Sequence, residues 1–147
     1  MGKEISAGAI IFCKENKKIK YLLLFREGSE HYKPLWGFPR GKIEENEEEM
    51  NTVKREIEEE TGLKKLKFLK FREKINWFYR RDNETIFKES IFYLAESENE
   101  EVKISDEHDD FKWCSFDEAM KLLKFKNAKE ILKKADEFLK GSLMNFV

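Results

Sequence analysis

The feature that most constrains this chain is a glutamate-rich segment, residues 41–63, with the sequence GKIEENEEEMNTVKREIEEETGL. Within it, Met50, Val53 and Ile57 recur at three- and four-residue spacing, which predicts a helix with one apolar face over residues 47–61. The glycine that follows predicts the C-terminal end of this helix. The segments on both sides read as strands, so the fold must combine this helix with a sheet.

Three acidic side chains of this helix are predicted to lie together. Glu56, Glu59 and Glu60 are three and four residues apart and therefore project from one side. Like charges at this spacing destabilise an isolated helix by about 0.2–0.5 kcal/mol per pair. The cluster is therefore either a solvated surface or a cation site. Carboxylate oxygens without Cys or His suit Mg²⁺ or Mn²⁺ rather than zinc.

Two neighbouring residues favour the cation site. Arg55 can orient a carboxylate by a bidentate contact, and Gly41 permits a tight turn that brings main-chain carbonyls near the same helix face. A divalent cation held there would neutralise phosphate charge, orient a leaving group and lower the pKa of a bound water.

Composition narrows the functional classes. The chain has 147 residues, the size of one domain, and 29 Lys and Arg against 30 Asp and Glu leave a net charge of -1, without the global basic field of many nucleic-acid binders. No apolar run approaches the roughly 20 residues needed to span a bilayer, and the first residues lack a signal-peptide core, so a cytoplasmic protein is expected. Cys13 and Cys114 are too few for a CxxC metal site and are expected to be reduced and buried.

The remaining segments predict an α+β fold in one domain spanning residues 1–147. Ser115 and Glu118 fit a capping box at the start of a short helix, and Asn127 and Glu130 are placed to cap a last helix over residues 128–140. Residues 64–79 and 85–95 are expected to form a hairpin whose tip is residues 80–84. The predicted strands are residues 4–13, 19–26, 64–79, 85–95 and 111–115. Strands mixed with three helices without regular alternation indicate a mixed sheet between helices.

The glutamate-rich segment also matches a known pattern. It reads G-x5-E-x7-R-E-U-x-E-E-x-G-U, where U is a bulky aliphatic residue, and it resembles the Nudix box at every specified position. The matching residues are Gly41, Glu47, Arg55, Glu56, Ile57, Glu59, Glu60, Gly62 and Leu63. The resemblance implies a Nudix fold: an α/β/α sandwich with a central mixed sheet and a catalytic loop–helix–loop that binds divalent cations. It implies a hydrolase in which water attacks a phosphoanhydride bond of a nucleoside polyphosphate.

The resemblance also implies roles for individual residues. Arg55 matches the arginine that braces the glutamates, and Glu47 the acid that supports the loop. Glu107 matches a loop glutamate that binds metal or activates water, which leaves the general base open between Glu107 and a box glutamate. The implied ligands of Mg²⁺, or of Mn²⁺ as a substitute, are Glu56, Glu59, Glu60, Glu107 and the main-chain carbonyl of Arg40.

Segments outside the box resemble diadenosine tetraphosphate hydrolases of this family. LWGFPRGKIE (residues 35–44) is similar to their W-x-x-P-K-G segment, with Arg40 in place of lysine. Tyr79, sixteen residues after Leu63, resembles the position where a ring stacks on adenine, and residues 105–139 are similar to their C-terminal part. The implied substrate contacts are Tyr79, Lys88, Arg40, His31 and Phe125, with Phe125 alternatively a core residue. Trp36 and Trp113 are expected to pack rather than to bind.

The predicted reaction is the asymmetric cleavage of diadenosine tetraphosphate to ATP and AMP. The alternatives are an RNA 5′-pyrophosphohydrolase, a house-cleaning hydrolase of nucleoside triphosphates, and a nucleotide sensor that does not cleave. The expected partner is a small nucleotide, with no membrane and no nucleic acid except an RNA 5′ end under the first alternative. The oligomeric state is left open between monomer and dimer.

Overall fold

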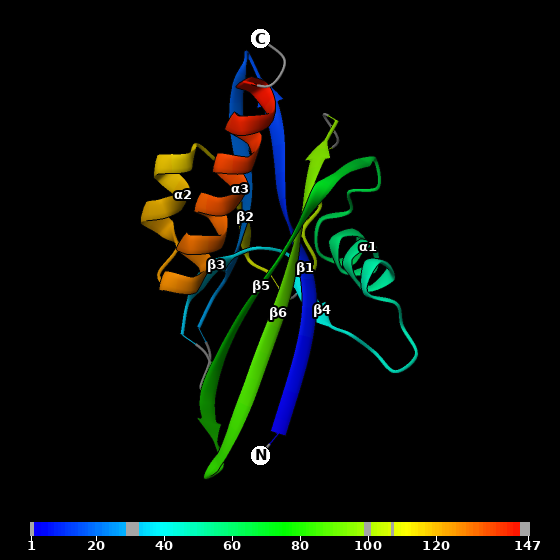
Figure 1. Ribbon diagram of the computed structural model, residues 1–147, viewed down its shortest axis with the longest axis vertical. Coiled ribbons are helices and arrows are strands. Elements are labelled where there is room, and N and C mark those ends of the chain that lie inside the picture. Colours follow the sequence, from blue (N-terminus) through cyan, green and yellow to red (C-terminus); the bar gives the residue numbers. More distant parts are fainter. Residues whose placement is uncertain (1, 29–32, 99–100, 107, 145–147) are drawn as a thin grey trace.

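The computed structural model describes residues 2–28, 33–98, 101–106 and 108–144. In order, the elements are β1 (Gly2–Glu15), β2 (Lys18–Arg26), β3 (Leu35–Gly37), β4 (Arg40–Lys42), α1 (Glu49–Thr61), β5 (Leu66–Arg81), β6 (Glu84–Ser97), β7 (Asp110–Cys114), α2 (Phe116–Leu122) and α3 (Lys126–Met144). Helix α1 covers one face of the sheet, and α2 and α3 cover the other (Figure 1). The predicted mixed sheet between helices is confirmed.

The sheet has an interruption beside β1. Its strand order is β3-β2-β1-β6-β5, with β4 paired to β1 and β7 paired to β2. The β1–β6 pair is parallel, and the other pairs are antiparallel. Along one edge, residues 6–8 of β1 pair with β4, whereas residues 12–15 pair with β2. The edge of β1 therefore changes partner, and the loop before α1 approaches the sheet at this point.

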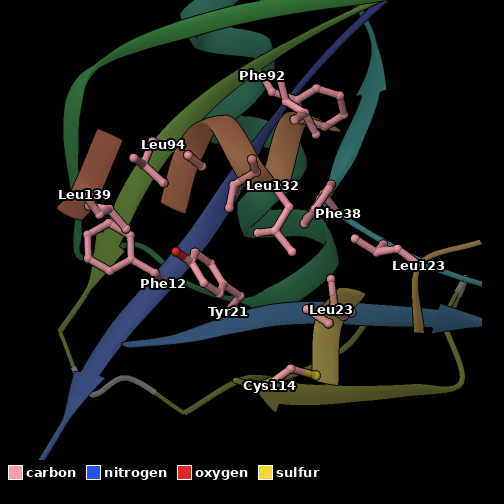
Figure 2. Close-up of a cluster of buried hydrophobic side chains, with 14 of the residues drawn as sticks. Phe12, Tyr21, Leu23, Phe38, Phe92, Leu94, Cys114, Leu123, Leu132 and Leu139 are labelled. Carbon is pink, nitrogen blue, oxygen red and sulfur yellow. The ribbon is translucent and has the colours of Figure 1, made fainter. Parts of the chain in front are cut away.

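Alternating side chains of the central strands form two cores. On β1, Ile10 and Phe12 face α2 and α3, whereas Ala9 and Ile11 face α1. Figure 2 shows the first core, where α3 lays Leu132 and other apolar side chains against the strands. Full burial of each large apolar side chain contributes about 1.5–3 kcal/mol. These two cores place α1 and α3 on opposite sides of the same strands.

The local signals at three element ends are confirmed. Helix α1 ends at Gly62, whose backbone N–H donates to the Glu58 carbonyl. Ser115 and Glu118 form the predicted capping box at the start of α2. The β5–β6 hairpin is present, and its turn consists of Asp82 and Asn83, both with positive φ, because the two strands continue further than the sequence pattern indicated.

Three expectations are wrong in detail. Asn127 does not cap α3, because the Lys129 N–H already donates to the Phe125 carbonyl and the first turn begins before Asn127. Helix α1 begins at Glu49 rather than at residue 47, because the Glu47 side chain accepts hydrogen bonds within the preceding loop. Cys114 is buried as expected, whereas Cys13 is half-buried.

Among the helices of the described residues, none is both long enough and apolar enough to cross a bilayer.

A buried tyrosine ties α3 to the sheet. Tyr21 on β2 donates a hydrogen bond of 2.6 Å to Asp136 Oδ1, and Lys140 Nζ lies 2.8 Å from the other carboxylate oxygen. Burial and the Asp136 carboxylate raise the pKa of Tyr21, which keeps its hydroxyl a neutral donor. We expect Tyr21→Phe to lower the free energy of unfolding by about 1.5–3 kcal/mol, because the buried carboxylate loses this donor. Urea denaturation measures this change. A loss below about 0.5 kcal/mol would contradict the assigned role.

Candidate active site

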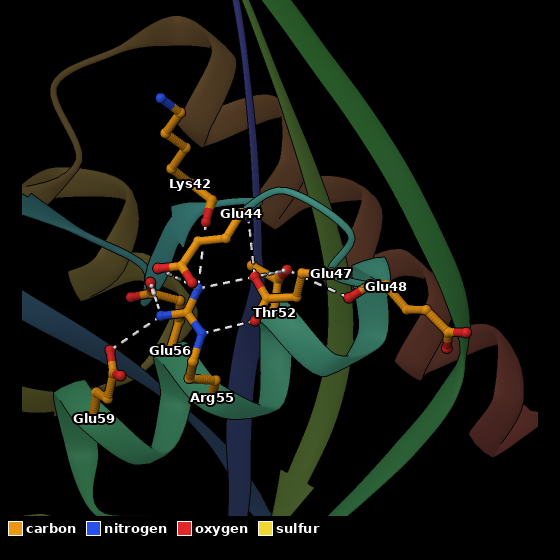
Figure 3. A network of polar contacts seen from close by, with 8 residues as sticks. All are labelled: Lys42, Glu44, Glu47, Glu48, Thr52, Arg55, Glu56 and Glu59. Carbon is orange, nitrogen blue, oxygen red and sulfur yellow. Dashed lines mark hydrogen bonds and ion pairs between the residues drawn. The ribbon is translucent and has the colours of Figure 1, made fainter.

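The centre of the candidate site is the Arg55 side chain on α1 (Figure 3). Its Nε and Nη2 atoms donate to the two carboxylate oxygens of Glu47 at 2.8 and 3.0 Å. Its Nη1 atom donates to Glu56 at 2.8 Å and to Glu59 at 3.3 Å. These carboxylates raise the pKa of Arg55, with the Glu47 hydrogen bonds contributing most. One guanidinium therefore holds two acids of the predicted cluster, Glu56 and Glu59, together with Glu47 from the preceding loop.

Glu47 fixes the loop before α1. Its Oε1 atom accepts hydrogen bonds from the Glu44 backbone N–H at 3.1 Å and from the Thr52 hydroxyl at 2.7 Å. Arg55, Thr52 and this backbone N–H lower the pKa of Glu47 from 4.5 to about 2. The loop and the first turns of α1 are thus joined through one ionised carboxylate.

This arrangement predicts a pH-dependent contribution of Glu47 to stability. A carboxylate with a lowered pKa in the folded state stabilises the fold above its unfolded pKa, and the stabilisation is lost as the pH falls through the folded pKa. We therefore expect Glu47→Gln to lower the melting temperature at pH 7, with the difference shrinking below pH 4.5 and closing near pH 2. Melting curves of both proteins across this range measure it. A difference that is constant with pH would contradict the role of the charge.

Glu60 lies apart from the Arg55 network. Its side chain is 5% exposed, and its Oε1 atom lies 3.8 Å from His108 Nε2. The Ser105 N–H donates to the Glu60 carbonyl at 3.3 Å, and the His108 N–H donates to the Ser105 carbonyl at 3.1 Å. The segment before β7 is therefore fastened to the end of α1 beside this acid.

Gly41 allows the Glu56 carboxylate to lie against the backbone of β4. A Cβ atom at this position would lie 2.0–2.4 Å from the carboxylate atoms of Glu56, a distance that no real contact has. The peptide that joins Arg40 to Gly41 therefore runs directly beside this acid. The missing side chain creates room for close approach of carboxylate and main-chain oxygens.

The donor set fits a hard divalent cation. It consists of the three box carboxylates and the nearby Arg40 carbonyl, and such oxygen ligands suit Mg²⁺ or Mn²⁺. Within the described residues, which exclude Glu107, no three acidic, His or Cys side chains gather closely enough to hold an ion. In the structure, the Glu56 and Glu59 carboxylates accept hydrogen bonds from Arg55, whereas Glu60 Oε1 lies 3.8 Å from His108 Nε2.

A cavity of about 570 Å³ opens beside Glu60. It lies between the strand face that carries Ser6 and Lys88 and the start of α3, and His108 also lines it. Its aromatic lining residues are Trp36, Phe38, Trp77, Phe92 and Phe125, and its cationic ones are Arg26, Arg40, Lys42, Lys88 and Lys126. Aromatic walls with several cations suit a ligand that combines a planar ring with a polyanion.

Burial and neighbouring positive charges lower the pKa values of two cationic side chains in the cavity, Lys88 and Arg40. Burial lowers the pKa of Lys88, and the nearby Arg40 lowers it further, while Glu4 acts in the opposite direction. Burial also lowers the pKa of Arg40, and Arg26 adds to this effect. A bound polyanion would favour the charged form of both side chains.

Of the predicted substrate-binding residues that the structure describes, three line the cavity and Tyr79 does not. Arg40, Lys88 and Phe125 line the cavity, whereas Tyr79 lies beyond its lining residues and donates a hydrogen bond to Glu4. Trp77, which the sequence analysis did not single out, lines the cavity. The period of two along β5 puts both rings on one face, so the pattern alone could not tell which reaches the cavity.

Three further expectations concern aromatic and loop residues. Trp36 lines the cavity as well as packing against Phe25, with ring centroids 5.0 Å apart, so the expectation that it only packs is incomplete. Trp113 packs against the core beneath α1, as expected. His31 and Glu107 lie outside the described residues, and their roles remain predictions.

Comparison with known proteins agrees with this geometry. Residues 2–135 match the family model described as the NUDIX domain, and the chain belongs to the Nudix family. This result confirms the predicted family of hydrolases, whose members generally use divalent metals and act on small nucleotides.

Relatives within the family match almost end to end. The asymmetrical bis(5′-nucleosyl)-tetraphosphatase of Mus musculus is 32% identical over 145 residues, covering 91% of this chain and 94% of the relative. The enzyme with the same name from Caenorhabditis elegans is 29% identical over 144 residues, covering 92% and 96%. A crystal structure of a C. elegans Ap4A hydrolase binary complex superposes with a TM-score of 0.81 at 29% identity, covering 94% and 98% of the two chains. The predicted Nudix fold is confirmed.

Proposed function

We propose that this protein hydrolyses diadenosine tetraphosphate asymmetrically, to ATP and AMP. The observation that carries the proposal is the cavity in which a box glutamate, Glu60, meets several cations and aromatic walls. A dinucleoside polyphosphate combines planar bases with a polyanion, and the cavity combines aromatic and cationic lining residues with the acidic Glu60. The relatives named for this reaction support the same substrate.

The acidic end holds the metal in this proposal. Glu56, Glu59, Glu60 and the Arg40 carbonyl are the ligands within the described residues, and the metal is Mg²⁺. When bound, it supplies charge neutralisation on the phosphates and acidifies a water. Arg55 donates hydrogen bonds to both Glu56 and Glu59 and would brace these two carboxylates at the metal site.

The basic end holds the polyphosphate. Arg40, Lys88 and Arg26 all line the cavity; Arg26 acts on the pKa of Arg40, and Arg40 acts on the pKa of Lys88. Their charge stabilises the negative charge that shifts onto the leaving nucleotide as water attacks in line. Glu107 or a box glutamate accepts the proton of that water.

An adenine base is expected to stack on Trp77, with Phe125 across the cavity mouth. Stacking on an aromatic side chain contributes about 1–3 kcal/mol per base, so Trp77→Ala should raise KM for diadenosine tetraphosphate roughly 5- to 140-fold. Steady-state kinetics of Trp77→Ala and Tyr79→Ala, measured side by side, separate the two candidate rings. A larger increase in KM for Tyr79→Ala would transfer the role to Tyr79 and would require its hydrogen bond to Glu4 to open.

Product analysis by anion-exchange chromatography tests the proposed reaction. The protein is incubated with Mg²⁺ and, separately, with diadenosine tetraphosphate, ADP-ribose, dGTP and 5′-triphosphorylated RNA. Equal amounts of ATP and AMP, formed with the highest kcat/KM of the panel, are the expected result. Preferred release of pyrophosphate from RNA or dGTP would contradict the assignment of diadenosine tetraphosphate as the substrate. Tight binding without any hydrolysis would instead indicate the nucleotide sensor. A cytoplasmic location and one domain over the whole chain remain predictions.

A further inference from the structure

Two buried serine hydroxyls lie beneath the cavity. Ser6 on β1 and Ser90 on β6 stand opposite each other in the parallel register and are 3% and 0% exposed. Their Oγ atoms are 2.7 Å apart. Buried hydroxyls cost free energy unless they are hydrogen-bonded. The bond between the two serines meets this requirement.

The partner of this serine pair is Arg40. Its Nη1 atom donates to Ser90 Oγ at 3.1 Å, and its guanidinium carbon lies 5.7 Å from the centre of the Trp77 ring. Arg40 begins on β4, which pairs with β1 at Gly8. A Cβ atom at Gly8 would lie 2.1 Å from the Pro39 carbonyl oxygen and 2.6 Å from Arg40 Cβ. The absence of a side chain at Gly8 therefore lets Arg40 cross β1 and reach β6.

The chemistry of these contacts differs from that of an ion pair. A guanidinium carries five N–H donors in a rigid plane, and a serine oxygen accepts one of them without adding negative charge. Arg40 takes part in none of the ion pairs formed among the described residues. Glu60 acts on the Arg40 charge from a longer range, so the direct side-chain hydrogen bond that orients the guanidinium is the one to Ser90.

We propose that Ser6 and Ser90 are positioning residues that hold the Arg40 guanidinium in the cavity in a fixed orientation for a phosphate group. The inference rests on the proposed function, because it assigns Arg40 to the polyphosphate. Ser90 acts by direct contact with Arg40, and Ser6 acts by orienting the Ser90 hydroxyl. A lysine at this position would lack both the planar fork and the second donor edge.

Binding of inorganic tripolyphosphate in EDTA, measured by calorimetry, tests the inference without metal and without hydrolysis. Ser90→Ala is expected to weaken binding about fivefold to tenfold, and Ser6→Ala by a smaller factor. On an Arg40→Ala background, Ser90→Ala should change the affinity by less than about twofold, because the residue acts through Arg40. In turnover of diadenosine tetraphosphate, Ser90→Ala should lower kcat/KM by a factor similar to its effect on tripolyphosphate binding, and on the Arg40→Ala background it should lower kcat/KM by less than about twofold.

Ser97→Ala is the matched control, since Ser97 is another buried serine of β6, 5% exposed, and lies outside the cavity. It should leave tripolyphosphate binding unchanged. Equal losses in Ser90→Ala and Ser97→Ala, or an undiminished loss on the Arg40→Ala background, would overturn the positioning role. Unchanged binding in Arg40→Ala would overturn it as well. The product analysis tests the proposed reaction separately. It can contradict cleavage of diadenosine tetraphosphate while tripolyphosphate binding by the single and double variants still supports the positioning role.

Discussion

Replacing Glu59 or Glu60 by glutamine is expected to reduce turnover at least about a hundredfold while the fold survives. Each substitution keeps the size of the side chain and removes one negative charge from the proposed metal site. The charge that stabilises the transition state then falls with the metal occupancy. Glu60 is the more informative of the two, because it lies at the wall of the cavity and its backbone carbonyl fastens the segment before β7.

Steady-state kinetics with Mg²⁺ and Mn²⁺ binding by electron paramagnetic resonance measure this effect. Glu58→Gln is the matched control, since Glu58 lies on the same helix, is exposed and faces Lys64 rather than the site. Near-wild-type turnover in both Glu59→Gln and Glu60→Gln would rule out the assignment of these acids. A loss accompanied by a lower melting temperature in the Glu60 variant alone would point to the contact with His108 instead.

Gly41→Ala is expected to be nearly as damaging, with a loss of turnover of about a hundredfold. The new methyl group would lie 2.0–2.4 Å from the Glu56 carboxylate, so either Glu56 or the β4 backbone must move. A displacement on the order of 1 Å at reacting groups costs about a hundredfold in rate. The same movement would disturb the bond between Glu56 and Arg55.

Turnover and Mn²⁺ affinity of Gly41→Ala, compared with Gly141→Ala, test this expectation. Gly141 lies near the end of α3, and a Cβ atom there would meet nothing within 4 Å. The control should keep full activity. Unchanged metal affinity in Gly41→Ala would show that Glu56 adapts by rotating its side chain, and the close contact would then carry no catalytic role.

Much of the fold followed from local patterns because these patterns depend on neighbours in sequence. Val53 and Ile57 predicted the buried face of α1, and Ser115 with Glu118 predicted the start of α2. The spacing of the box also placed Arg55 among the acids that it contacts. Helical geometry and hydrogen bonds over three or four residues determine these features, so a single sequence is sufficient to find them.

The cavity was less accessible to sequence reasoning because it depends on contacts between distant segments. Trp77 reaches the cavity and Tyr79 does not line it, although both share one face of β5. The difference arises from what each ring meets: Tyr79 finds Glu4 on β1, whereas Trp77 lies beside Arg40 from β4. The Ser6–Ser90 pair joins residues 84 positions apart, and no local pattern identifies either serine as special.

The change of partner along the edge of β1 has a consequence for how this scaffold can diversify. The acids come from α1 on one layer, whereas Trp77, Lys88 and Phe125 come from the strand face and the start of α3 in the other. Glu60 of α1 and these recognition residues line the same cavity, beside the stretch of β1 that pairs with β4. Evolution or laboratory selection can therefore vary the recognition half, altering which nucleotide is accepted, without touching the half that carries out the bond cleavage. Libraries restricted to β5 and the α2–α3 connection, which leave Lys88 and Ser90 of β6 unchanged, should yield new specificities on an unchanged reaction.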